Sequence, residues 1–167
     1  MTYTIRPATR DDSRFIWTLA MDPSVRENST RSEEFDFASH DAWYAEKLAH
    51  PEMHRIWIME VGGVPVGQVR YGRCDLYEWC PGGGGPHLIG RQAEIAIAID
   101  PARRGQGFAK TLVRETLDLA KSWLAVSTLV ALVLRTNRRS RRLFRSLGFR
   151  YVGAECRLGR VHARYEL

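Results

Sequence analysis

The first part of the chain has apolar residues at strand and helix spacings, which predict one strand and two helices. Residues 3–6 alternate as in a strand, and Thr9 followed three positions later by Asp12 is typical of a capping box that opens a helix through about residue 20. Pro23 is expected to end this helix, because proline lacks the N–H that a continuing helix requires. After a polar stretch, apolar positions at helical spacing predict a second helix over residues 40–49.

The middle of the chain predicts a β-hairpin followed by an irregular segment. Two apolar runs, residues 55–61 and 64–70, flank a Gly-Gly pair, which is typical of a two-residue turn. Gly67 inside the second run indicates a bulge or a close approach of two backbones. The run PGGGGP does not favour regular structure, so residues 74–91 are expected to form a mobile loop or lid.

The second half predicts a strand, a turn and a helix, followed by further strands. Residues 93–100 alternate between apolar and polar positions, and residues 107–125 have the spacing of an amphipathic helix. The predicted apolar face of that helix consists of Leu112, Val113, Leu117, Leu119, Ala120 and Trp123. Later strands are expected over residues 129–134, 150–155 and 161–166, with an arginine-rich helix after the first of them. This order predicts one α+β domain over residues 1–167, with a mixed, mostly antiparallel sheet and helices on both faces.

The turn RRGQGFA at residues 103–109 has the composition of a phosphate-binding loop. Gly105 and Gly107 have no Cβ atoms, so several backbone N–H groups can converge on one pyrophosphate at the positive end of the following helix. A turn of this kind is a weak signal by itself, and without a ligand it would be an ordinary connection. Its place between an alternating strand and an amphipathic helix favours the phosphate site. The residues predicted at the phosphates are Arg104, Gly105, Gln106, Gly107, Phe108 and Ala109.

A resemblance to a known family rests on this turn and on a second group of residues. The turn is similar to the coenzyme A loop of the GCN5-related N-acetyltransferases (GNAT), which reads Gln or Arg, two residues, Gly, one residue, then Gly or Ala. Arg104, Gly107 and Ala109 fit that pattern. A second family landmark is formed by Asn137, Ser140, Leu143, Phe144 and the run Leu147-Gly148-Phe149. The resemblance covers most of the chain and implies the GNAT fold of about seven strands, acetyl-CoA as cosubstrate, and acetyl transfer to an amine.

The resemblance also implies how the coenzyme is held. The main chain of Ile97 and Ile99 would hydrogen-bond the pantetheine arm, with both side chains in the core. Asn137 would hydrogen-bond the amide groups of the coenzyme. Ser140 would contact the coenzyme or only cap a helix.

Two residues bear on the proton transfers that the chemistry requires. Glu94 stands where family members often place the carboxylate that accepts the proton of the amine, directly or through water. The alternative is a solvent-exposed charge at a strand edge. Phe144 departs from the tyrosine with which many relatives protonate the departing sulfur, so another acid, a water, or helix and backbone dipoles must serve.

Three stretches in the first half of the chain bear on the identity of the acceptor: VREN, SHDAWYAEKL and GVPVGQVRY. They resemble the acetyltransferases that modify the 4-amino group of nucleotide-linked amino sugars on the route to pseudaminic and related nonulosonic acids. By that resemblance, the acceptor-binding residues are His40, Trp43, Tyr44, Gln68 and Arg70. Packing within the helix is the alternative for the two aromatic residues. Three other functions stay open: acetylation of protein amino termini, as in relatives that modify ribosomal proteins, a non-catalytic coenzyme-binding module suggested by Phe144, and RNA binding.

Composition narrows these classes. The chain has 167 residues, of which 44% are hydrophobic and 26% charged, and a net charge of +6. Seven arginines fall within residues 135–150, where they surround an apolar stripe of Leu143, Phe144 and Leu147. A solvated helix face with some phosphate contacts is therefore favoured over nucleic-acid binding. The cysteines at positions 74, 80 and 156 form no C-x-x-C pair, so no metal is expected. The absence of a signal-peptide pattern and of a long apolar run predicts a cytoplasmic protein without a membrane partner, and a homodimer is left open.

Overall fold

The computed structural model describes residues 2–31, 33–79 and 86–167. Its seven strands form one sheet in the order β1-β2-β3-β4-β5-β7-β6. The strands are β1 (Tyr3–Pro7), β2 (His54–Val61), β3 (Val64–Trp79), β4 (Pro86–Ile99), β5 (Thr128–Leu134), β6 (Arg150–Arg157) and β7 (Arg160–Glu166). Every neighbouring pair is antiparallel except β4 and β5. The predicted mixed, mostly antiparallel α+β sheet is confirmed.

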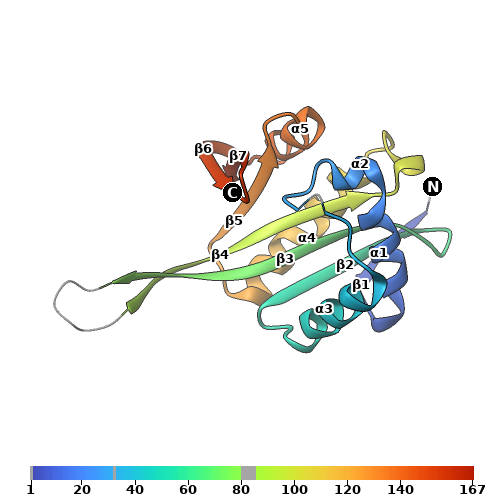
Figure 1. The fold of residues 1–167 in the computed structure, drawn as a ribbon, viewed down its shortest axis with the longest axis horizontal. Helices are drawn as coiled ribbons and strands as arrows, with labels where there is room; N and C mark the ends of the chain where they lie inside the picture. The colour runs from blue at the N-terminus through green and yellow to red at the C-terminus, as the bar shows by residue number, and fades with distance from the viewer. Residues whose placement is uncertain (1, 32, 80–85) are drawn as a thin grey trace.

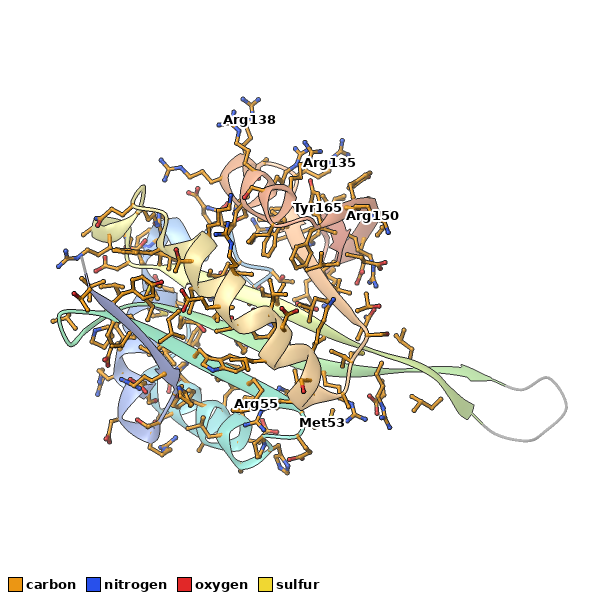
Figure 2. The ribbon with its side chains drawn as sticks, turned by 180° about the vertical axis from the view of Figure 1, so that it is seen from behind. Met53, Arg55, Arg135, Arg138, Arg150 and Tyr165 are labelled. Carbon is orange, nitrogen blue, oxygen red and sulfur yellow. The ribbon has the colours of Figure 1, made fainter. Side chains whose placement is uncertain are left out.

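Helices cover both faces of this sheet, as Figures 1 and 2 show from opposite sides. The helices are η1 (Arg10–Asp12), α1 (Ser13–Met21), α2 (Pro23–Arg26), α3 (Phe37–Ala49), η2 (Pro101–Arg103), α4 (Phe108–Leu124) and α5 (Arg138–Ser146). On one face, α4 covers the larger apolar cluster, which includes Leu112, Val113 and Phe144. On the other face, α1 and α3 enclose a smaller cluster around Ile16 and Tyr44.

The start of the first helix follows its predicted capping box. The Thr9 backbone N–H donates to an Asp12 carboxylate oxygen at 2.7 Å. The same carboxylate, which is buried, receives two hydrogen bonds from the Arg6 guanidinium at 2.7 and 2.8 Å. Pro23 does not directly follow the first helix, because α1 ends at Met21 and Pro23 begins the short α2. Proline fits there because the first helical N–H has no intrahelical acceptor.

The hairpin of β2 and β3 has the predicted Gly-Gly turn, and both glycines have positive φ. The register shifts next to Gly67, between Met59 and Glu60. A Cβ on Gly67 would lie 3.1 Å from the Ala98 backbone carbonyl oxygen and 2.3 Å from Ile99 Cδ1. Both parts of the interpretation of Gly67, a bulge and a close approach, are therefore confirmed.

The expectation that residues 74–91 form a loop or lid is wrong for the described part. β3 continues to Trp79 and β4 begins at Pro86, with the two strands paired over this stretch. They extend as a two-stranded arm beyond the rest of the sheet (Figure 1). Cross-strand pairing extends the two strands past the rest of the sheet, whatever the composition of the glycine run between them. Cys80 and residues 81–85, which include most of that glycine run, lie outside the described residues.

The predicted apolar face of α4 is partly wrong. Leu112, Val113 and Ala120 are fully buried, but Leu119 is 46% exposed and Trp123 48% exposed. The buried stripe instead includes Thr116, whose hydroxyl lies 2.9 Å from that of Tyr71. A buried hydroxyl with a hydrogen-bond partner can occupy a core position that a purely hydrophobic count assigns elsewhere.

Candidate active site

The site begins where β4 and β5 separate. These strands pair in parallel only over residues 92–94 and 128–130, and β5 then turns away toward α5 (Figure 1). The Asp100 backbone N–H donates to the Val66 carbonyl of β3, so the backbone groups of the preceding residue, Ile99, face away from β3. The Ile99 carbonyl accepts a hydrogen bond from Arg104 Nε at 3.1 Å. Alternate residues of a strand direct their backbone groups to the same side. The main chain of Ile97 therefore faces the same gap, which is where the prediction requires it for a pantetheine arm.

The turn after β4 has the geometry of an anion cradle. Gly105 and Gly107 both have φ of 82°, and a Cβ on either would meet no described atom within 4 Å. Gly107 precedes the first turn of α4, whose leading N–H groups have no intrahelical acceptors. Phe108 is buried and anchors the start of the helix in the core. Open space beside free N–H groups at the positive end of a helix fits a pyrophosphate.

Arg104 has a structural role in this cradle. Besides its bond to the Ile99 carbonyl, its Nη1 donates to Ser24 Oγ at 2.8 Å. The guanidinium thus ties the turn to α2. The exposed arginines 138, 139 and 142 on α5 line the other side of the cleft, and Figure 2 shows Arg138 extended away from the ribbon. These three side chains are available to phosphate oxygens.

The landmark residues of α5 divide between capping and packing. The Asn137 side chain caps the helix by accepting a hydrogen bond from the Ser140 backbone N–H at 3.1 Å. The capping role considered for Ser140 therefore belongs to Asn137. Phe144 borders the cleft but is only 3% exposed, and it packs edge to face on Phe149 at 5.1 Å between ring centroids.

Glu94 lies at the point where the strands separate and is held by an arginine. Its carboxylate is 38% exposed and accepts a hydrogen bond from Arg157 Nη1 at 2.5 Å. Arg157 also bonds Glu155, which in turn bonds Arg164. Burial lowers the pKa of Arg157, but the bonds to Glu155 and Glu94 outweigh it and leave that pKa raised. The arginine therefore keeps its charge and orients the Glu94 carboxylate.

The predicted acceptor residues come together on the face of the sheet that α1 and α3 cover. His40 and Trp43 from α3 and Gln68 and Arg70 from β3 line the same cleft as Glu94. Tyr44 does not reach it: its side chain is fully buried, and its hydroxyl donates to the Thr9 carbonyl at 2.7 Å. Successive helical positions point in different directions, so Trp43 faces the cleft while Tyr44 packs in the core.

One continuous cleft of about 1790 Å³ joins these groups to the phosphate turn. Of the predicted site residues, all line it except Tyr44 and the exposed Gln106. Phe35, Thr136 and Arg157 also line it, although sequence reasoning assigned no site role to them, and so does Arg26 of the VREN stretch. No motif marks Phe35, Thr136 or Arg157, because they reach the cleft only through contacts between distant segments.

The segment between α2 and α3 forms one wall of the cleft and is tied to β7. Arg160 Nη2 donates to the Glu27 carbonyl at 2.7 Å, and its Nη1 donates to the Ser29 carbonyl. The Thr30 hydroxyl lies 3.4 Å from His162 Nε2. The amino-terminal and carboxyl-terminal halves of the sheet are thereby bridged across the gap between β4 and β5.

Among the described residues, no group of three or more His, Cys, Asp or Glu side chains is placed to hold a metal ion. No helix in this part of the chain is long and apolar enough to cross a membrane.

Parted strands followed by a glycine turn at the start of a helix are the arrangement expected of an acyl-CoA-dependent transferase. The chain belongs to the GNAT acetyltransferase family, whose domain model matches residues 3–150. It is an N-acetyltransferase that uses acetyl-CoA. It is 32% identical over 148 residues to the N-alpha-acetyltransferase RimI of Mycobacterium tuberculosis, with 82% of each chain covered. It is also 26% identical over 149 residues to the spermidine N(1)-acetyltransferase of Escherichia coli K12, covering 89% of this chain and 73% of that one.

Solved structures show the same fold. The spermidine N-acetyltransferase of Vibrio cholerae, in complex with CoA and spermine, superposes with a TM-score of 0.78 at 23% identity, covering 99% of this chain and 94% of that one. An N-acetyltransferase from Staphylococcus aureus superposes with a TM-score of 0.77 at 23% identity, covering 100% of this chain and 98% of that one.

Proposed function

We propose that this enzyme acetylates the primary amine of a small molecule, and that the acceptor is a nucleotide-activated amino sugar. The observation that carries this proposal is the size and continuity of the cleft. Its volume of about 1790 Å³ exceeds the range of roughly 300 to 1,000 Å³ that is usual for a single ligand. Such a cleft can hold acetyl-CoA together with an acceptor larger than a simple amine. Trp43, Gln68 and Arg70 supply a mixed polar and aromatic lining suited to a sugar and its charged carrier.

Three residues have separate roles in the proposed acetyl transfer. Glu94 accepts the proton of the attacking amine, directly or through one water, and Arg157 orients its carboxylate. The amine nitrogen then forms a bond to the thioester carbonyl carbon, and the carbon–sulfur bond breaks to release the thiolate. Phe144 has no proton to give, so solvent or the helix and backbone dipoles stabilise that thiolate.

Acetylation of a protein amino terminus is the second candidate, because the chain is 32% identical to RimI. A polypeptide end needs an open groove in which several residues can lie extended. Here the segment around Ser29 and Thr30 spans the gap and is tied to β7. That tether favours a small acceptor over a protein.

A panel assay of thiol release from acetyl-CoA tests the proposal. The acceptors are nucleotide-linked 4-amino sugars, peptides with a free alanine or serine amino terminus, and a blank without amine. The proposal predicts the highest kcat/KM with a nucleotide-linked sugar. Preference for a peptide would establish the second candidate, and no release above the blank with any amine would indicate a non-catalytic module.

A further inference from the structure

One wall of the cleft is a row of three aromatic rings with an arginine guanidinium at each end. The Arg26 guanidinium lies 4.9 Å from the Phe35 ring centroid, and the Phe35 ring stacks on His40 at 5.9 Å. His40 is 5.6 Å from Trp43, and the Arg70 guanidinium lies 4.9 Å from the Trp43 centroid. All five side chains line the cleft. We call these five residues the cationic wall.

Arg70, like Arg26 at the other end of this wall, is half-buried and forms no ion pair among the described residues. Within the described part of the chain, no carboxylate lies within 4.0 Å of its guanidinium. By contrast, Arg157 and Arg164 in the neighbouring network each bond two carboxylates. Burial lowers the pKa of Arg70, and the more distant charge of Glu94 offsets this only in part. A partly desolvated guanidinium without a counterion is costly unless a ligand supplies one.

His40 adds a second unsatisfied group beside Arg70. Its residue is only 4% exposed, and Nε2 has no hydrogen-bond partner among the described residues. Burial and the nearby Arg70 charge lower the pKa of this imidazole, so it is neutral at pH 7. The wall therefore offers a planar cationic fork, a neutral ring nitrogen and an aromatic platform on the acceptor side.

We propose that the cationic wall binds an anionic group, phosphate or carboxylate, carried by the acceptor, so that the enzyme selects anionic amines and rejects polycations. This rests on the proposed function, namely that a small amine is acetylated in this cleft. The guanidinium fork of Arg70 matches the paired oxygens of such a group. The same charge repels a polyamine, which offers no anion to pair with it.

Binding to the CoA-loaded protein tests this inference without relying on turnover. Calorimetry with UDP, glutarate and spermidine as probes is run on the parent, on Arg70→Gln and Arg70→Lys, and on Arg150→Gln as a control. Arg150 is exposed at the start of β6 and does not line the cleft. We expect UDP or glutarate to bind and spermidine not to bind. Arg70→Gln should weaken anion binding by about 10- to 100-fold, the range for one charged hydrogen-bonded contact. Arg70→Lys should fall between, and Arg150→Gln should match the parent.

The outcomes separate this inference from the proposed function. Binding of UDP would identify phosphate as the anion, and binding of glutarate would identify carboxylate. Either result supports anion binding by the cationic wall. Three results would overturn anion binding by the cationic wall, even if the parent acetylates a neutral amine. They are failure of both anions to bind, binding of spermidine, and a folded Arg70→Gln variant with the anion affinity of the parent. If UDP binds through Arg70 but no amine elicits thiol release, anion binding by the cationic wall is supported and the proposed function is refuted.

Discussion

Replacing Gly107 by valine separates the phosphate role of the turn from its backbone geometry. Gly107 has φ of 82°, and a Cβ there would project into open space beside the first turn of α4. The positive φ costs a non-glycine residue about 1–3 kcal/mol in folding stability. Valine would in addition place two methyl groups where the phosphates approach the backbone N–H groups. We therefore expect the Kd for acetyl-CoA to rise more than tenfold, about 1.4 kcal/mol or more.

Gly63→Val is a matched control for that strain. Gly63 has φ of 78° with no described atom within 4 Å of its Cβ position, but it lies in the β2–β3 turn away from the cleft. Both variants should lose about 2–4 °C in Tm for each kcal/mol of strain. Calorimetric titration with acetyl-CoA should show weaker binding only for Gly107→Val. A folded Gly107→Val protein with the parent's affinity would refute the phosphate role of this turn.

Three further predictions concern the proton transfers and the fold. Glu94→Gln should lower kcat by roughly two orders of magnitude with little change in acetyl-CoA affinity, and a pH–rate profile that overlays that of the parent would make Glu94 merely structural. Phe144→Tyr should change kcat by less than about tenfold if solvent or dipoles already stabilise the thiolate. If instead the parent is inactive and the tyrosine variant gains activity, the natural protein has lost its catalytic function. Burial raises the pKa of Asp12, but its hydrogen bonds to Arg6 and Thr9 have a larger, opposite effect, so the net pKa lies below its usual value. Its contribution to stability is therefore complete above its unfolded pKa of about 4 and is lost as the pH falls through the lower folded value. Thermal melts of Asp12→Asn should show a weaker acid dependence than the parent.

Local signals were sufficient for the glycine turn after β4 and most of the elements around it. The positive φ of Gly105 and Gly107 follows from their place between a strand and a helix, and the structure has both. The β2–β3 hairpin was likewise predictable, because its glycine turn fixes the pairing of the flanking strands.

Features set by distant contacts were not predictable from the sequence. The ion pair of Glu94 with Arg157 joins residues 63 positions apart. Nothing local distinguishes Arg157 from the other arginines of the chain. The same holds for the side chains of α3, where the helical pattern alone does not decide that Trp43 lines the cleft and Tyr44 packs in the core. The arm of β3 and β4 depends on cross-strand pairing, which composition does not encode.

Transfer of the acetyl group of acetyl-CoA to an amine in this cleft is tested most directly by mass spectrometry of the acceptor. The parent protein is incubated with acetyl-CoA and a nucleotide-linked 4-amino sugar. We expect one acetyl group on the sugar nitrogen, formed in step with thiol release and strongly reduced in Glu94→Gln. Thiol release with no acetylated acceptor, or no reaction with any amine by a folded protein that binds acetyl-CoA, would contradict this transfer.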